Sequence, residues 1–139
     1  MIRYLLDTNI VSELSRPDPH AHVLAKMRRH GRESAISSVC LHELVYGVVR
    51  LPDGRKKAWL SKYLETMVLP ALQVLEYDSA ASIWHARERA RLTAAGQTPA
   101  FVDGMIAATA ASRSLILVTR NERDFASFQG LSVVNWFEN

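Results

Sequence analysis

The sequence is poor in cysteine and has no long hydrophobic run. Cys40 is the only cysteine among 139 residues, so an internal disulfide is impossible and the spacing of a cysteine zinc site is absent. We expect Cys40 to be a small buried side chain. No apolar stretch approaches the ~20 residues that span a bilayer, and the first residues lack the apolar region of a secretory signal. We therefore expect a cytoplasmic protein with no membrane segment.

The chain also lacks several features that mark other function classes. Neither sign of charge dominates, since the formal net charge is only +3. This charge permits a polyanionic partner but requires none. Repeats and low-complexity segments are absent, and the histidines show no ligand spacing. A Gly-rich phosphate loop after the first predicted strand is missing, which argues against a nucleotide-binding switch.

Short apolar segments with alternating strand and helix patterns make up most of the chain. We predict strands at residues 4–6, 35–37, 74–75, 115–118 and 133–134, and helices at 8–15, 20–30, 38–51, 56–69, 78–95 and 101–112, with a helical turn or two at 121–128. This alternation predicts a single α/β domain over residues 1–139, with helices on both faces of a central, mainly parallel sheet. Ligands of such folds collect beyond the carboxyl ends of the strands.

Polar side chains interrupt the apolar segments close to these strand ends. Asp7 follows the first strand in LLDTNIVSEL, Glu43 interrupts SSVCLHELVYGVV, and Asp103 interrupts TPAFVDGMIAATAA. Asn121 and Asp124 follow another strand in LILVTRNERDF. We expect each acid to lie among buried residues, where carboxylates without a neighbouring cation repel one another and become protonated. A divalent cation resolves this repulsion, and oxygen-only ligands suit Mg²⁺ or Mn²⁺.

Each of these residues also has a purely structural explanation. Asp7 is suited to cap the following helix, Glu43 to a partly exposed helix face, and Asp103 to a cap or a pair with an arginine. Asp124 is suited to bonds with backbone amides of the last turn, and Asn121 to a turn position. Taken together, these structural explanations are less convincing, because a parallel sheet brings the strand ends, and so these polar residues, to one place.

The three acidic motifs, in their order and spacing, resemble the PIN domain. LLDTNIVSEL, SSVCLHELVYGV and FVDGMIAATAASRSLILVTRNERDF are similar to the VapC and FitB group of toxin–antitoxin ribonucleases, and the resemblance covers nearly the whole chain. It implies a PIN-like three-layer α/β/α sandwich and a metal-dependent endoribonuclease with Mg²⁺ or Mn²⁺ in an acidic pocket. It further implies that Asp7, Glu43 and Asp103 are the catalytic and metal-binding residues.

The same resemblance implies supporting residues around the pocket. Thr119 matches a threonine or serine that supports it, Asp124 takes a supporting place, and Asn121 stands where many relatives carry a fourth acid. Because an amide carries no charge, Asn121 leaves open whether one metal ion acts or two. Arg120 and Arg123 flank these residues and are candidates for contact with RNA phosphates.

The resemblance also implies partners for the chain. These are an RNA substrate, a cognate antitoxin whose carboxyl-terminal segment covers the pocket, a second copy in a homodimer, and an assembly on operator DNA through the antitoxin. A row of apolar residues after Pro52 is a candidate antitoxin surface, and we expect part of it to be exposed: Trp59, Leu60, Tyr63 and Leu64.

Two other functions remain open from the sequence. A non-catalytic PIN-fold module that acts through antitoxin and operator-DNA binding would explain the missing fourth acid, although a surface for phosphates has no use for clustered negative charge. A phosphohydrolase of the haloacid dehalogenase type would use Asp7 as its nucleophile. That class needs a second aspartate two residues later, and Asn9 stands there.

Overall fold

The computed structural model describes residues 1–138, so Asn139, the last residue of the predicted domain, lies outside the described residues. Within them, five strands form one sheet in the order β3-β2-β1-β4-β5, and every neighbouring pair is parallel. The strands are β1 (Tyr4–Leu6), β2 (Ser34–Ser37), β3 (Gln73–Leu75), β4 (Ile116–Val118) and β5 (Ser132–Val134). The predicted α/β class with a central parallel sheet is confirmed.

The helices follow the predicted segments, with differences at their ends. They are α1 (Thr8–Leu14), α2 (Ala21–His30), α3 (Ser38–Val49), α4 (Arg55–Tyr63), α5 (Ser79–Ala94) and α6 (Phe101–Ala111). The helix predicted over 56–69 changes after α4 to a π-helical turn over Leu64–Val68, where the Leu69 amide donates to the Leu64 carbonyl. The segment predicted as a helical turn or two over 121–128 is a single 3₁₀ turn, Glu122–Phe125.

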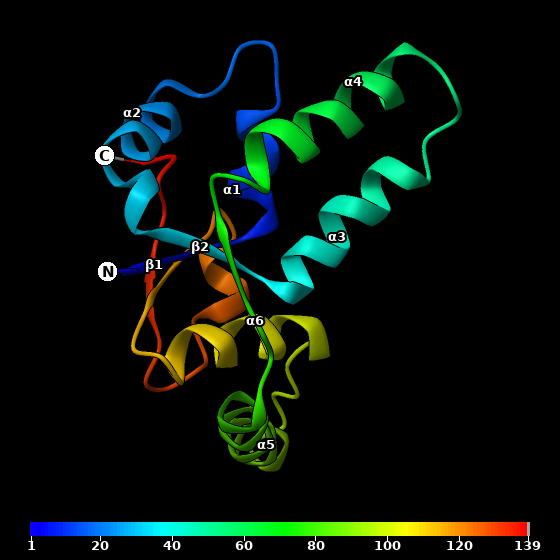
Figure 1. Ribbon diagram of the computed structural model, residues 1–139. Coiled ribbons are helices and arrows are strands. Elements are labelled where there is room, and N and C mark those ends of the chain that lie inside the picture. The colour runs from blue at the N-terminus through cyan, green and yellow to red at the C-terminus, as the bar shows by residue number, and fades with distance from the viewer. Residues whose placement is uncertain (139) are drawn as a thin grey trace.

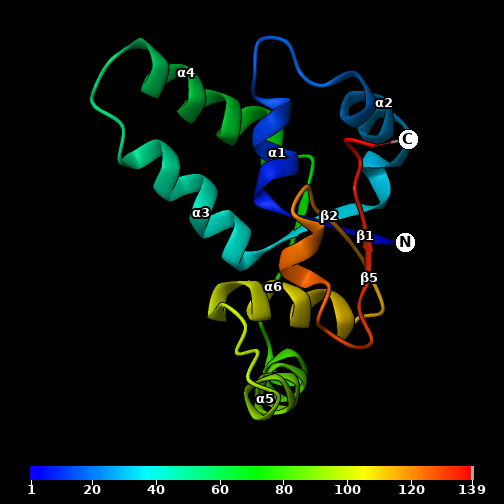
Figure 2. The same cartoon turned by 180° about the vertical axis from the view of Figure 1, so that it is seen from behind.

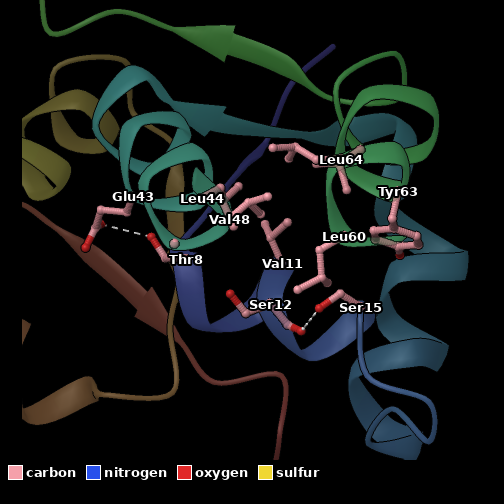
Figure 3. A pocket seen from close by; sticks show the side chains of 12 residues that line it. Thr8, Val11, Ser12, Ser15, Glu43, Leu44, Val48, Leu60, Tyr63 and Leu64 are labelled. Atoms are coloured by element: carbon pink, nitrogen blue, oxygen red, sulfur yellow. Dashed lines mark hydrogen bonds between the residues drawn. The ribbon is translucent and has the colours of Figure 1, made fainter. Parts of the chain in front are cut away.

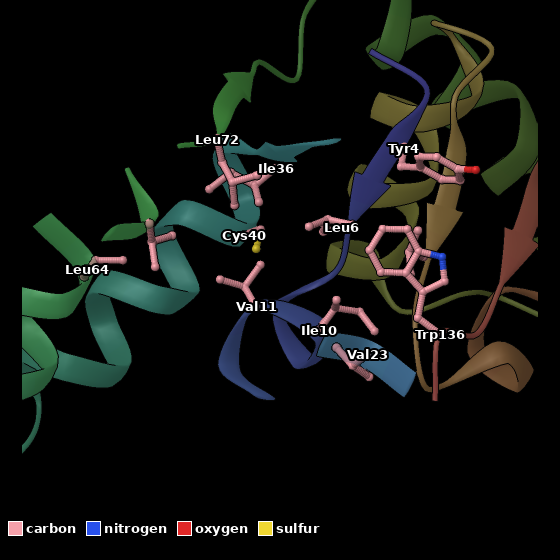
Figure 4. Packing of buried hydrophobic residues seen from close by; sticks show 12 residues of the cluster. Tyr4, Leu6, Ile10, Val11, Val23, Ile36, Cys40, Leu64, Leu72 and Trp136 are labelled. Carbon is pink, nitrogen blue, oxygen red and sulfur yellow. The ribbon is translucent and has the colours of Figure 1, made fainter. Parts of the chain in front are cut away.

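The sheet lies between two helical layers, as Figures 1 and 2 show. Helices α1 to α4 lie on one side of it, and α6 lies on the other side, between the sheet and α5. Successive side chains of a strand point to opposite faces of the sheet, so they pack alternately against these two helical layers. Leu6 packs in the cluster on the α1 side, which Figure 4 shows, while Leu5 packs in the cluster with α5 and α6. Cys40 is fully buried in the first cluster, as predicted, and burial raises the pKa of its thiol to about 12.

The order of the strands shows which edge of the sheet is suited to bind a ligand. The chain runs from β1 to β2 and β3 on one side, then returns to β4 on the opposite side of β1. The carboxyl ends of β1 and β4 therefore flank the point where the strand order reverses, which is where parallel sheets bind ligands. Asp7 and Thr119 are the first residues after these two strands. None of the helices in residues 1–138 combines the length and the apolar character that crossing a membrane demands.

Candidate active site

Asp7 is held by groups from both strands at the reversal point. Its backbone amide donates to the carbonyl of Val118 at 2.9 Å. Its Oδ1 accepts from the Thr8 amide at 2.8 Å, and its Oδ2 accepts from the Thr119 hydroxyl at 2.9 Å. Asp7 is also the N-cap of α1, so its predicted capping role is confirmed. The carboxylate is fixed in place and only 8% of the residue is exposed.

Asn9, for which no site role is predicted above, joins the ends of β1 and β4. Its amide group donates to Oγ1 of Thr119 and to Oδ2 of Asp7, each at 3.4 Å, and its Oδ1 accepts from the backbone amide of Arg120 at 3.1 Å. Thr119 is fully buried and also accepts from the amide of Asn121 at 3.1 Å. The supporting position predicted for Thr119 therefore has a definite geometry: it ties Asp7 to the segment after β4.

Glu43 reaches the site from the exposed side of α3. The hydroxyl of Thr8 donates to its Oε1 at 2.9 Å. The expectation that Glu43 lies among buried residues is wrong, because α3 and α4 project away from the sheet, as Figures 1 and 2 show. Its apolar neighbours Tyr46 and Val49 are 60% and 62% exposed for the same reason. Asp124 and Asn121 are exposed too, so only Asp7 and, partly, Asp103 fit the predicted burial.

Asp103 lies in the first turn of α6 and is partly buried. Burial raises the pKa of its carboxyl to about 6, with further contributions from the negative charges of Asp124, Asp7 and Glu43. The pKa of Asp7 is also raised, mainly by burial, although the bonds from Thr119 and Thr8 oppose this. Within residues 1–138, Asp7, Glu43 and Asp103 form no ion pair with a lysine, arginine or histidine.

One hollow of about 300 Å³ brings the predicted acids together. Its lining comprises Asp7, Thr8, Asn9, Ser12, Glu43, Val102, Asp103, Ile106 and Asn121. We call it the acid pocket. No three His, Cys, Asp or Glu side chains of residues 1–138 stand close enough to form a metal cluster by themselves. The pocket therefore gathers negative charge without direct convergence of three carboxylates on one point.

The remaining predicted residues lie beside the acid pocket. Arg120, Arg123 and Asp124 line a neighbouring polar depression that shares Asn121 with it. The guanidinium of Arg120 lies over the ring of Phe137, 4.4 Å from its centroid. Asp124 acts on Asp103 through its charge, and neither arginine lines the acid pocket itself.

A second, mostly apolar hollow of about 200 Å³ adjoins the acid pocket, and Figure 3 shows it between α1, α3 and α4. The two share Thr8, Ser12 and Glu43. Leu60 and Tyr63 line this hollow and also a groove between α4 and residues 14–19, which includes Trp59. Trp59 is 55% exposed whereas Leu64 is buried, so the expectation that part of this row is exposed is confirmed.

The raised pKa of Asp103 predicts that the metal-free protein loses stability as the pH rises from 3.8 to about 6. The folded state binds this proton more tightly than the unfolded chain does. Its contribution to the free energy of unfolding is therefore complete below the ordinary pKa of Asp103 and lost above the raised pKa. Asp103→Asn does not titrate, so its free energy of unfolding relative to wild type should rise across this window. Because solvent screens this partly exposed group, we expect a rise of about 1 kcal/mol. Urea unfolding in EDTA from pH 3.5 to 7 measures it, and a pH-independent difference would contradict the assignment.

Comparisons with known proteins point to one family. The family model described as the PIN domain matches residues 4–131. The VapC ribonuclease Y4jK of Sinorhizobium fredii is 34% identical over 137 residues, covering 96% of this chain and 97% of the relative. The tRNA(fMet)-specific endonuclease VapC of Salmonella typhimurium is 32% identical, covering 98% and 99%. The solved structure of FitAB bound to a DNA fragment matches with a TM-score of 0.89 and 31% identity, covering 98% of this chain and 96% of that one.

Proposed function

Because the chain belongs to the PIN domain family, we propose that it is a metal-dependent endoribonuclease, the toxin of a type II toxin–antitoxin module, and that it hydrolyses RNA phosphodiester bonds. The observation that carries the proposal is the acid pocket. Three carboxylates from three separate segments, Asp7, Glu43 and Asp103, line one hollow at the reversal point of the sheet.

The donor set of the pocket fits a hard divalent ion such as Mg²⁺ or Mn²⁺. Its polar groups are carboxylate, hydroxyl and amide groups. Burial raises the pKa of Asp103, and the negative charges of Asp124, Asp7 and Glu43 raise it further. Asp7 and Asp103 would hold the ion and Glu43 would hold it or a bound water. Mg²⁺ usually binds one or two carboxylates and keeps several waters, so three direct ligands are not required. Such an ion supplies a water of lowered pKa and stabilises charge on the phosphate.

The residues around the pocket would orient Asp7, accept a proton and contact the RNA. Thr119 and Asn9 fix the orientation of Asp7 before substrate arrives, so little reorganisation is needed during reaction. Thr8 occupies Oε1 of Glu43, and the other oxygen, Oε2, is our candidate acceptor for the proton of the attacking water. Asn121 contributes a neutral oxygen where a fourth acid would add charge, so a second ion should bind weakly. Arg120 and Arg123, in the adjoining depression, are candidates for contact with phosphates along the RNA.

Restraint by an antitoxin is part of this proposal. The FitAB relative was solved with DNA, and a toxin of this kind would reach operator DNA through its antitoxin. The apolar hollow beside the acid pocket suits an antitoxin segment, because a chain lying there also reaches Glu43 and blocks substrate. A homodimer is the expected state of the toxin.

One alternative function has a specific observation in its favour. Asn121 lines the pocket where a fully acidic quartet would place a carboxylate, which favours a non-catalytic module that binds antitoxin. The three retained acids argue against it. Asp7 is buried, and burial makes its charged form less favourable, so a module that only binds a partner would gain nothing from keeping this carboxylate. Membership of the PIN family disfavours the haloacid dehalogenase alternative.

The test is cleavage of RNA by purified, antitoxin-free protein. We expect new RNA fragments with Mg²⁺ or Mn²⁺ and none with excess EDTA, because the described lining of the pocket contains no lysine, arginine or histidine that could replace the ion. Sequencing the new 5′ ends identifies the target. Antitoxin-free protein that binds Mn²⁺ but leaves total RNA intact under all conditions would instead support the non-catalytic module.

A further inference from the structure

A buried histidine packs against the helical turn that carries Asp103. His85 of α5 is only 2% exposed, and its Nδ1 lies 2.8 Å from the hydroxyl oxygen of Tyr77. Its ring centroid is 4.8 Å from that of Phe101. Within residues 1–138 its Nε2 has no hydrogen-bond partner, and this atom faces Gly104, the residue after Asp103. A Cβ on Gly104 would stand 2.2 Å from Nε2.

This contact leaves room for no side chain at residue 104. Cβ atoms essentially never come within 3.0 Å of another heavy atom, so any other residue would push α6 or the imidazole away. The imidazole has little freedom to move, because Tyr77 holds one edge and Phe101 packs against the ring. Burial, together with the positive charge of Arg89, lowers the pKa of His85 and so favours the neutral ring. We assign the tautomer in which Nδ1–H donates to Tyr77, because a hydrogen on Nε2 would press against Gly104.

The first turn of α6 begins without a capping side chain. Its N-cap is Ala100, which has no side chain able to bond the free amides of the turn. The histidine touches this turn at Phe101 and at Gly104, on either side of Asp103 along the chain. Packing by α5 therefore supports a helical turn that has no capping side chain.

We propose that His85 is a positioning residue that sets the place of Asp103 in the acid pocket. It acts through Phe101 and Gly104 and touches neither substrate nor metal. The inference rests on the proposed function, because only the role of Asp103 as a ligand gives its position a chemical consequence.

Gly104→Ala is the direct probe, read out by titration with Mn²⁺ alone. The added methyl meets Nε2, so the turn that carries Asp103 must shift. We expect the dissociation constant for Mn²⁺ to rise about 10- to 100-fold, the range seen when supports of metal ligands are removed. The kcat for RNA should fall with it while KM for RNA stays close to wild type. This loss should occur although alanine is the better helix former.

The double variant Gly104→Ala with His85→Asn separates positioning from general damage. Asparagine keeps a polar group near Tyr77 but removes the ring edge that meets the methyl, so the double variant should bind Mn²⁺ more tightly than Gly104→Ala alone. His85→Asn by itself should weaken Mn²⁺ binding, and this arm carries the test if Gly104→Ala does not fold. Leu92→Ala, in the core on the same helix, is the control: it should lower the melting temperature and leave Mn²⁺ affinity unchanged.

The outcomes distinguish this inference from the proposed function. If wild type neither binds Mn²⁺ nor cleaves RNA, the proposed function fails. If wild type does both, and Gly104→Ala and His85→Asn each match its Mn²⁺ affinity, only the positioning role is overturned. A double variant no better than Gly104→Ala would also overturn it, because the clash with His85 would then not be the cause.

Discussion

Asp7→Asn is expected to reduce RNA cleavage at least about 1000-fold and to leave the protein folded. Charge stabilisation by a bound ion contributes several kcal/mol to a phosphoryl reaction, and each 1.36 kcal/mol corresponds to a factor of ten in rate. Asparagine removes the charge of the most buried acid in the pocket, which Thr119 and Thr8 orient. The measurement is the initial rate of cleavage of a defined RNA in Mg²⁺, with Mn²⁺ affinity determined in parallel.

The fold should tolerate this change because asparagine keeps the capping oxygen. Its Oδ1 still accepts from the Thr8 amide, so the N-cap hydrogen bond at the start of α1 is kept. Burial and Glu43 raise the pKa of Asp7, so losing the charge should keep or raise the melting temperature in EDTA. Asp18→Asn, the same chemical change at an exposed position, is the matched control and should retain full activity. Undiminished cleavage by folded Asp7→Asn protein would refute the role of this residue.

Phe125→Ala should cause the largest loss of stability among these variants, about 3–5 kcal/mol in the free energy of unfolding. Phe125 is 2% exposed and packs with Leu5, Leu117 and Phe128 on the α6 side of the sheet. The truncation leaves a cavity in that cluster, between the sheet and the 3₁₀ turn that follows Asn121. The melting temperature should therefore fall by roughly 10 °C or more.

Urea unfolding in EDTA measures this loss directly. Met67→Ala is the control, because its side chain is 60% exposed and surface truncations usually change stability by less than about 0.5 kcal/mol. A similar loss in both variants would mean that Phe125 is not part of the core. The site should respond as well: Phe125 anchors the segment that carries Asn121 and Asp124, so Mn²⁺ affinity should also decline in the folded fraction.

Local patterns in the chain predict most of the elements correctly. The alternation of apolar strands and amphipathic helices gives the α/β class, because each pattern reports the two faces of a single element. Asp78, the first residue of the helix predicted over 78–95, is the N-cap of α5. The ends are less certain: Leu115 belongs to the turn after α6, where its amide donates to the Ala110 carbonyl, and β4 begins one residue later.

The sequence by itself determined which residues stand at the ends of strands and helices, because short-range hydrogen bonding and hydrophobic periodicity decide those positions. Only the tertiary structure decided which of them meet. The reversal of strand order between β1 and β4 brings Asn9 to Thr119, 110 positions along the chain, and the projection of α3 exposes Glu43. The contact of His85 with Gly104 likewise depends on how closely α5 and α6 pack, and that distance follows from the volume of every side chain between the two helices.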